Sequence, residues 1–307
     1  MTVHFRTSLT VLLAAGLTLP AINASWTDAG AVATAGQNVL WRDPGDMATR
    51  DLFYGPGGKA HEPRGPYTFD KEDLKGSNPK FVVKDANGVK WKVKLGPEAR
   101  PETVATRVIW AVGYYANEDY FLRDLQVTGM PAHLHRGAKL ISSDGTMHDV
   151  RLKREDEKKT GVWKWRDDPF AGTREWYGLR VLMAVINNWD LKDVNNAIYQ
   201  AGDSQNVYLV SDVGSSFGTS SLRWPLWKAK GDVESYARSK FIVRTNEKTV
   251  DFANPGRPEF VFLVHLKNYI ERLHMRWIGR EIPREDARWM GNQLARLSPQ
   301  RTRRELD

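Results

Sequence analysis

The sequence predicts an α+β fold with two lobes, a small strand-rich N-terminal lobe and a mainly helical C-terminal lobe. In the first half of the chain, two alternating apolar runs are joined by an Asn-Gly turn and followed by one helical pattern. In the second half, apolar helical patterns surround a single short hairpin pattern. The chain has 307 residues, of which 41% are hydrophobic and 27% charged. This composition is typical of a folded globular protein and excludes a disordered one.

The N-terminus has the pattern of a signal peptide. Positive charge in MTVHFR precedes the apolar run TSLTVLLAAGLTLPA, and small residues near Ala24 offer a cleavage site. Residues 1–24 are therefore predicted to be a signal peptide, with an uncleaved anchor as the alternative. The mature protein would then be secreted or periplasmic, without an integral membrane span. Because the chain has no Cys, a lipoprotein anchor, disulfides and zinc sites built on thiolates are excluded.

Residues 25–140 are predicted to form the N-terminal lobe. Its Gly- and Pro-rich beginning contains the segment GPGGK, from Gly55 to Lys59. Further on, KFVVKDANGVKWKVKLG contains two alternating runs joined by Asn-Gly, which is a strong hairpin signal. On the second predicted strand, Lys92 and Lys94 share the face opposite Trp91.

A helix is predicted to follow in RPETVATRVIWAVGYYA. Pro101 suits its first turn, and Glu102 places negative charge at the positive end of the helix dipole. Glu102 projects to the edge of the apolar stripe, where a carboxylate is expected to have a partner. Glu98 is expected in the connection before the helix, because Pro101 disfavours helix at the preceding residue. Helical spacing predicts a buried stripe of Val104, Val108, Ala111, Val112 and Tyr115.

Residues 141–300 are predicted to form the C-terminal lobe, and residues 301–307 a basic tail. The lobe begins with a charged stretch, from about Asp144 to Asp168, that is predicted to be a ribbon or a connector between the lobes. It continues with TREWYGLRVLMAVINNW, a core helix that is apolar on nearly every side. The runs NAIYQ and NVYLVSD, separated by AGDSQ, predict a hairpin. Two more helices are predicted in EFVFLVHLKNYIERLHMRWIG and PREDARWMGNQLARL, the second of which opens with Pro283.

The stretch NNWDLKDVNNAIYQAGDSQNVYLVSDVGSSFG indicates chemistry most strongly. Asp190 follows the buried helix, Asn195 stands where the predicted hairpin begins, and Asp212 leaves that hairpin into a glycine turn. Mg²⁺ in nucleotide sites is bound by one or two carboxylates, with phosphates and water completing its shell. Phosphoryl transfer needs cations placed on the phosphates and a group that orients the attacking hydroxyl. The arrangement therefore predicts a nucleotide–metal site.

These motifs resemble those of the protein- and lipid-kinase-like superfamily. DLKDVN resembles the protein-kinase catalytic loop in the spacing of its Asp, Lys and Asn, and KWKVKLG resembles the strand that carries the phosphate-binding lysine. DVGSSFG is closer to the metal-binding turn of lipid and other atypical kinases. The His-Arg that precedes the catalytic Asp in protein kinases is here Asn188-Trp189. Together with the signal peptide, the pattern resembles an exported bacterial branch of atypical kinases.

The resemblance implies a role for each matching residue. Lys94 would hold phosphates and be fixed by Glu102; it is preferred to Lys92 because it lies nearer the strand's exit. GPGGK is the candidate for a phosphate-cradling loop, with a plain loop as the alternative. The implied sites are catalytic Asp190 and Lys192, nucleotide-binding Lys94, Glu102, Gly55, Gly57 and Gly58, and metal-binding Asn195 and Asp212.

The implied activity is transfer of a phosphoryl group from ATP or another nucleoside triphosphate, with Mg²⁺ or Mn²⁺, to an unknown acceptor. The net charge of +8 favours an anionic partner, such as an acidic lipid. No nucleic-acid partner is expected, since the charge is spread along the chain. Because the bacterial periplasm holds little ATP, nucleotidyl transfer and action as an effector elsewhere stay open. The alternative from another class is a non-catalytic pseudokinase of the cell envelope that binds nucleotide or phosphate.

Overall fold

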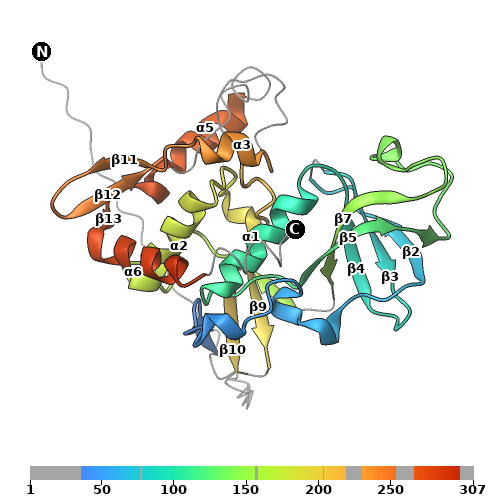
Figure 1. Ribbon diagram of the computed structural model, residues 1–307, viewed down its shortest axis with the longest axis horizontal. Coiled ribbons are helices and arrows are strands. Elements are labelled where there is room, and N and C mark those ends of the chain that lie inside the picture. Colours follow the sequence, from blue (N-terminus) through green and yellow to red (C-terminus); the bar gives the residue numbers. More distant parts are fainter. Residues whose placement is uncertain are drawn as a thin grey trace, which may run out of the picture. The chain divides into compact units, whose positions relative to one another are not determined.

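The computed structural model describes residues 36–297, except residues 77, 156–157, 203, 219–229 and 254–265. The described residues belong to one compact unit. The predicted signal peptide (1–24) and basic tail (301–307) lie outside them. The described residues form an α+β fold with three sheets and several helices (Figure 1). No helix among the described residues is both long enough and apolar enough to cross a membrane.

The first part of the chain forms a six-stranded sheet in the order β5-β7-β4-β3-β2-β6 (Figure 1). Strands β2, β3 and β4 form an antiparallel meander, and β7 pairs with both β4 and β5. The strands are β2 (Tyr67–Glu72), β3 (Lys80–Lys84), β4 (Lys90–Lys94), β5 (Asp119–Leu125), β6 (Val127–Thr128) and β7 (Met147–Arg154).

The predicted hairpin is present as β3 and β4, and Asp85 explains its turn. The Asp85 carboxylate accepts hydrogen bonds from the backbone amides of Asn87 and Val89 and from the Trp91 indole. An aspartate that bonds the amides following it stabilises a tight turn. One face of the sheet then forms a core with Phe81, Val83, Trp91, Val93, Leu95, Tyr120, Leu125, Val150 and Leu152.

The strand-rich part extends beyond residue 140, the boundary that the sequence predicted. Met147–Arg154 form β7, which lies inside the six-stranded sheet between β4 and β5. The charged composition of this stretch left a ribbon and a connector between the lobes as alternatives, and part of it is a strand of the sheet. It forms a strand because alternate side chains of β7, including Val150 and Leu152, enter the sheet's core.

Helix α1 (Ala99–Ala111) follows β4 and begins two residues before Pro101. Proline is tolerated there because amides in the first helical turn have no partner within the helix. The helix contacts β5 and β7 on one side, while Ala105 and Ile109 join the core that contains α2. Because α1 is covered on two sides, the predicted stripe is displaced: Val104 and Val108 are only half-buried.

The predicted second hairpin is present as β9 and β10, in a sheet ordered β1-β10-β9-β8. Its strands are β1 (Gln37–Val39), β8 (Lys159–Gly161), β9 (Asn196–Ala201) and β10 (Gln205–Val210). Before it, α2 (Arg174–Val185) is buried along most of its length, as predicted. Thr173 caps α2 by accepting a hydrogen bond from the Trp176 amide.

The last part of the chain packs on α2. Buried Arg180 donates hydrogen bonds to the carbonyls of Trp277, Ile278 and Arg280, which holds the C-terminal segment to that helix. Pro283 occupies the N-cap position of α6 without a side-chain hydrogen bond, and the predicted helix over 259–279 is described only from Leu266. The remaining elements are α3 (Val233–Ala237), α5 (Leu266–His274), α6 (Arg284–Ala295), β11 (Ile242–Thr245), β12 (Thr249–Phe252), β13 (Ile282–Pro283) and 3₁₀ helices η1 (Met47–Thr49), η2 (Gly55–Gly57), η3 (Lys59–His61), η4 (Ala138–Leu140), η5 (Asp193–Asn195) and η7 (Arg276–Gly279).

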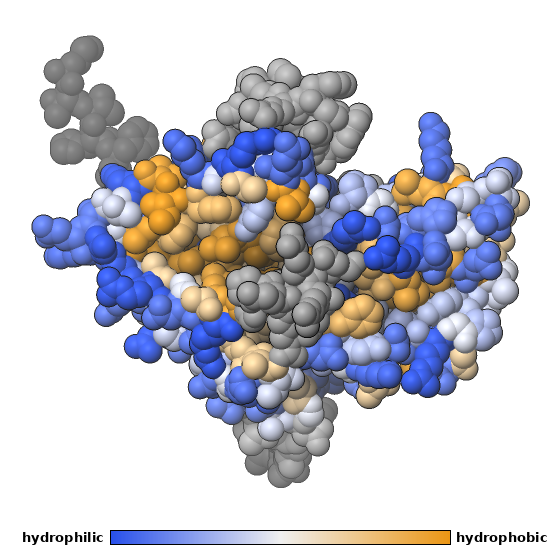
Figure 2. Space-filling model, in the orientation of Figure 1, coloured by the Kyte–Doolittle hydropathy of each residue, from blue (hydrophilic) through white to orange (hydrophobic). Residues whose placement is uncertain are grey.

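Hydrophobic residues are not spread evenly over the surface. Figure 2 shows hydrophobic residues gathered over the part of the molecule that contains α2 and β11, with hydrophilic residues along α6. Ile242 and Val243 of β11 are 55% and 56% exposed, so part of this hydrophobic surface belongs to a sheet edge.

Candidate active site around Lys94

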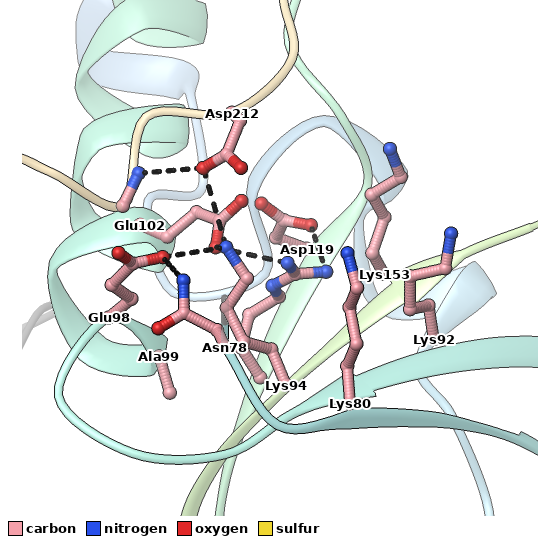
Figure 3. A network of polar contacts seen from close by, with 12 residues as sticks. Asn78, Lys80, Lys92, Lys94, Glu98, Ala99, Glu102, Asp119, Lys153 and Asp212 are labelled. Carbon is pink, nitrogen blue, oxygen red and sulfur yellow. Dashed lines mark hydrogen bonds and ion pairs between the residues drawn. The ribbon is translucent and has the colours of Figure 1, made fainter. Parts of the chain in front are cut away.

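The Lys94 ammonium, at the end of β4, lies among three carboxylates (Figure 3). Its Nζ is 2.6 Å from Glu102 Oε2, 3.1 Å from Glu98 Oε2 and 3.3 Å from Asp212 Oδ1. The three carboxylates offer oxygens within 4.8 Å of one another. The predicted contact between Lys94 and Glu102 is therefore present, and Asp212 reaches the same lysine from a distant part of the sequence.

Lys92, the alternative on the same face of β4, has other partners. Its Nζ lies 3.0 Å from Glu155 and 3.4 Å from Asp73, and its side chain is 24% exposed. The Lys94 side chain is only 4% exposed. The geometry thus agrees with the preference for Lys94 over Lys92, while the binding of phosphates by Lys94 stays a prediction.

A second buried cation, Arg151 of β7, shares Glu102 with Lys94. Arg151 Nη2 lies 3.0 Å from Glu102 Oε2, and its Nη1 lies 3.7 Å from Asp119 Oδ1. Arg151 stands directly opposite Lys94 in the pairing of β4 with β7. Glu102 is therefore held from two strands at once, which leaves it little freedom to move away from Lys94.

The charges of this cluster reinforce one another. Burial alone would lower the pKa of Lys94, but Glu102 and Asp212 outweigh it and raise that pKa above its usual value. Burial alone would raise the pKa of Asp212, but Lys94 and Arg151 lower it to about 2. Lys94 is therefore cationic and Asp212 anionic at neutral pH. An anionic Asp212 is what metal coordination requires.

The carboxylate of Asp119, in β5, is buried at the far end of this network, and nearby positive charge compensates its own charge poorly. Its two carboxylate oxygens have no hydrogen-bond partner among the described residues, and burial raises its pKa from 3.8 to about 6 despite the nearby charge of Arg151. The folded protein therefore binds the Asp119 proton more tightly than the unfolded chain does. The resulting stability is present at low pH and is lost as pH rises from 3.8 towards 6.

We predict that Asp119→Asn changes the pH dependence of stability. In the wild-type protein, Asp119 should raise the free energy of unfolding by about 1 kcal/mol as the pH falls from 7 to 5, since one pKa unit corresponds to about 1.36 kcal/mol. The variant lacks this contribution. Urea unfolding of both proteins at pH 5 and pH 7 measures it. Equal pH dependence of the two proteins would contradict the raised pKa.

Asn195 connects the Asp190 segment to the Asp212 segment. Its side-chain Nδ2 donates to the Asp190 carbonyl at 2.6 Å, and its own carbonyl accepts from the amides of Ser211 and Asp212 at 2.8 and 3.1 Å. Asn117, just before β5, donates to the Ser211 carbonyl. These bonds bring the three residues predicted from the motif into one connected loop structure.

Asp190 is positioned by the end of α2. The chain leaves the helix at Asn187, whose φ is 51°, and buried Asn188 accepts a hydrogen bond from the Asp190 amide. The Asp190 carboxylate lies 3.5 Å from Lys192 Nζ, and both side chains are about one-quarter exposed or less, at 21% and 24%. The predicted catalytic residues Asp190 and Lys192 are thus neighbours, and both can be reached by solvent.

Asn195 and Asp212 offer the donor atoms that Mg²⁺ or Mn²⁺ prefers, a carboxylate and an amide oxygen. The Asn195 amino group is used by the Asp190 carbonyl, which leaves its Oδ1 as the group able to bind a cation. The Asp212 side chain is 49% exposed, and its Oδ1 also accepts from the Gly214 amide. The donor set fits the predicted metal, although binding itself stays a prediction.

The GPGGK segment packs on α1 and β5. Gly55 packs on the Arg107 side chain of α1, and Tyr120 donates a hydrogen bond to the Gly58 carbonyl. A Cβ atom at Gly57 would lie 2.3 Å from the Tyr120 hydroxyl. Close packing therefore explains this glycine, and these contacts favour the structural alternative over a phosphate cradle for Gly55, Gly57 and Gly58.

The sequence patterns missed three further residues at the cluster. Glu98 was placed in the connection before α1, but its carboxylate reaches Lys94. Asn78, between β2 and β3, donates to Glu98 at 2.6 Å. Lys230, a described residue beyond Asp212, also contacts Glu98. The connection between β2 and β3 could have been expected to add a residue to the site. It follows the first strand of the meander whose last strand carries Lys94.

Comparisons with known proteins give little further guidance. No protein-family model matches the chain, and no curated protein matches it. The structure of a Helicobacter pylori proinflammatory kinase, CtkA, is 12% identical, with 78% of this chain and 91% of that chain covered and a TM-score of 0.35. A MAP kinase from Leishmania major, LmaMPK10, is 13% identical, with 79% and 82% covered and a TM-score of 0.22. Similarity at this level assigns neither fold nor activity to the chain.

Proposed function

We propose that the protein is a kinase-like phosphotransferase with a two-lobed fold of the atypical-kinase type. The observation that carries the proposal is the meeting of Lys94, Glu102 and Asp212 at one point. In protein kinases, a lysine on the third strand pairs with a glutamate of the next helix, near the metal-binding aspartate. Here Lys94 ends the third strand of the meander, and Glu102 lies in the helix that follows.

In this proposal, Lys94 binds phosphates of ATP or another nucleoside triphosphate. Glu102, itself held by Arg151, keeps Lys94 in place. Asp212 and Asn195 bind Mg²⁺ or Mn²⁺, which would neutralise the phosphates. Asp190 orients the acceptor hydroxyl, and Lys192 beside it stabilises charge on the transferring group.

The acceptor and the location belong to the proposal as well. The excess of 45 basic over 37 acidic side chains favours an anionic acceptor, including an acidic lipid. The N-terminal pattern favours export, which would place the activity outside the cytoplasm. A nucleotide-binding pseudokinase is the second candidate function, because an envelope protein without a supply of ATP has no use for transfer.

We expect the wild-type protein to form ADP from ATP in the presence of Mg²⁺ or Mn²⁺, and Asp190→Ala to reduce this rate by about 10²–10⁴-fold. The same variant should bind nucleotide as well as the wild-type protein, because Asp190 acts on the acceptor. A coupled assay of ADP formation and a nucleotide titration measure the two properties.

Asp193→Asn is the matched control, since Asp193 lies in the same loop but its carboxylate accepts a hydrogen bond from the Trp165 amide. An active enzyme keeps its rate in this control and loses it in Asp190→Ala. Nucleotide binding without ADP formation in any of the proteins would instead favour the pseudokinase.

A further inference from the structure

Three side-chain donors converge on the carboxylate of Glu98. Asn78 Nδ2 and Lys94 Nζ lie 2.6 and 3.1 Å from its Oε2, and Lys230 Nζ contacts its Oε1 (Figure 3 for Asn78 and Lys94). The donors come from three separate places: the connection between β2 and β3, the end of β4, and the chain beyond Asp212. The Glu98 side chain is only 5% exposed.

Two ammonium groups and an amide N–H are donors that can also bind a phosphate group. Lys80 adds positive charge, because it stands directly opposite Lys94 in the pairing of β3 with β4. Among the described residues, the carboxylate nearest to Lys80 is that of Asp73, at 3.8 Å. Lys94 is shared with Glu102 and Asp212, whereas Lys230 and Asn78 both contact Glu98, so Glu98 is the acidic group that occupies the donors on this side.

Gly214 allows Glu98 to occupy this position. A Cβ atom at Gly214 would lie 2.8 Å from Glu98 Oε2 and 2.9 Å from its Cβ. Any other residue would therefore press against Glu98. Gly214 follows Asp212, so the metal-binding turn and Glu98 are in direct contact.

We propose that Asn78, Lys94 and Lys230 form a binding site for a phosphate group of the nucleotide, and that Glu98 is an internal competitor for that site. This inference rests on the proposed function. A phosphate and the Glu98 carboxylate, both anionic, cannot share the three donors, so binding of the nucleotide displaces Glu98. Lys230 also lies 5.4 Å from the centre of the Trp189 ring, next to Asp190, so its release from Glu98 occurs beside the catalytic loop.

Removal of the competing charge should strengthen binding of a simple phosphate ligand. We expect Glu98→Gln to bind inorganic pyrophosphate at least about tenfold more tightly than the wild-type protein, because a like charge in contact with the ligand is removed. Isothermal titration without metal measures it, and thermal unfolding confirms that each protein is folded. Glu98→Ala, which removes the same charge, should show the same gain and serves if Glu98→Gln does not fold.

Single replacements in the Glu98→Gln background identify the donors. Lys230→Met and Asn78→Ala should remove the gain, whereas Lys92→Met should preserve it, because Lys92 pairs with Asp73 and Glu155. Unchanged or weaker pyrophosphate binding by both Glu98 variants would overturn the inference. If the wild-type protein binds Mg²⁺-ATP but neither Glu98 variant gains affinity for pyrophosphate, the inference fails and the proposed function stands. A gain for pyrophosphate without any binding of Mg²⁺-ATP supports the anion site and contradicts the function.

Discussion

Lys94→Met should destabilise the protein by about 3–5 kcal/mol and abolish nucleotide binding. Lys94 contacts Glu98, Glu102 and Asp212, and the Glu98 and Glu102 side chains are only 5% and 2% exposed. Removal of one partner from a buried ion pair leaves an uncompensated charge and costs this much free energy. Arg151 still pairs with Glu102, but Glu98 then depends on Lys230 and Asn78 alone.

Lys92→Met is the matched control for this experiment. Lys92 is on the same strand and the same face, but its pairs with Asp73 and Glu155 are partly exposed. Partly exposed ion pairs contribute about 0–1 kcal/mol, so this variant should unfold in urea almost as the wild-type protein does. Equal loss of stability in the two variants would contradict the claim that Lys94 compensates the buried carboxylates.

Asp212→Asn should weaken Mg²⁺-dependent nucleotide binding by at least about 100-fold and leave the fold intact. The loss of residues that merely support a metal ligand costs about 10–100-fold in affinity, so loss of a ligand should cost no less. The fold is expected to persist because the Asp212 side chain is 49% exposed and Lys94 keeps Glu98 and Glu102. Asp193→Asn again serves as the control and should bind nucleotide normally. A normal affinity of Asp212→Asn would exclude Asp212 as a metal ligand.

Local patterns were sufficient for the parts of the site that lie close together in the chain. Asn-Gly predicted the β3–β4 hairpin. Alternation along β4 put Lys94 on the face of the strand opposite to that of Trp91. The apolar runs around AGDSQ predicted the β9–β10 hairpin, with Asn195 just before it and Asp212 just after it. Each of these relations depends on neighbouring residues and on strand or helix period alone.

Relations that depend on pairing between distant segments could not be predicted. Arg151 reaches Glu102 because β7 pairs with β4. The charged sequence of β7 allowed a ribbon but did not indicate that this segment joins the sheet of the N-terminal part beside β4. Glu98 lies directly before α1, as expected, but no local pattern indicated that its carboxylate reaches Lys94 from there. GPGGK was linked to phosphate by its composition, whereas contact with Tyr120 decides its position.

The account depends most on the claim that Lys94, Asn195 and Asp212 form a nucleotide–metal site. Isothermal titration of the wild-type protein with ATP, once with Mg²⁺ and once with EDTA, tests this claim most directly. Saturable binding with Mg²⁺ that weakens strongly in EDTA, and that is lost in Asp212→Asn, is the predicted result. Absence of binding of any nucleoside triphosphate with either Mg²⁺ or Mn²⁺, by protein shown to be folded, would contradict the account.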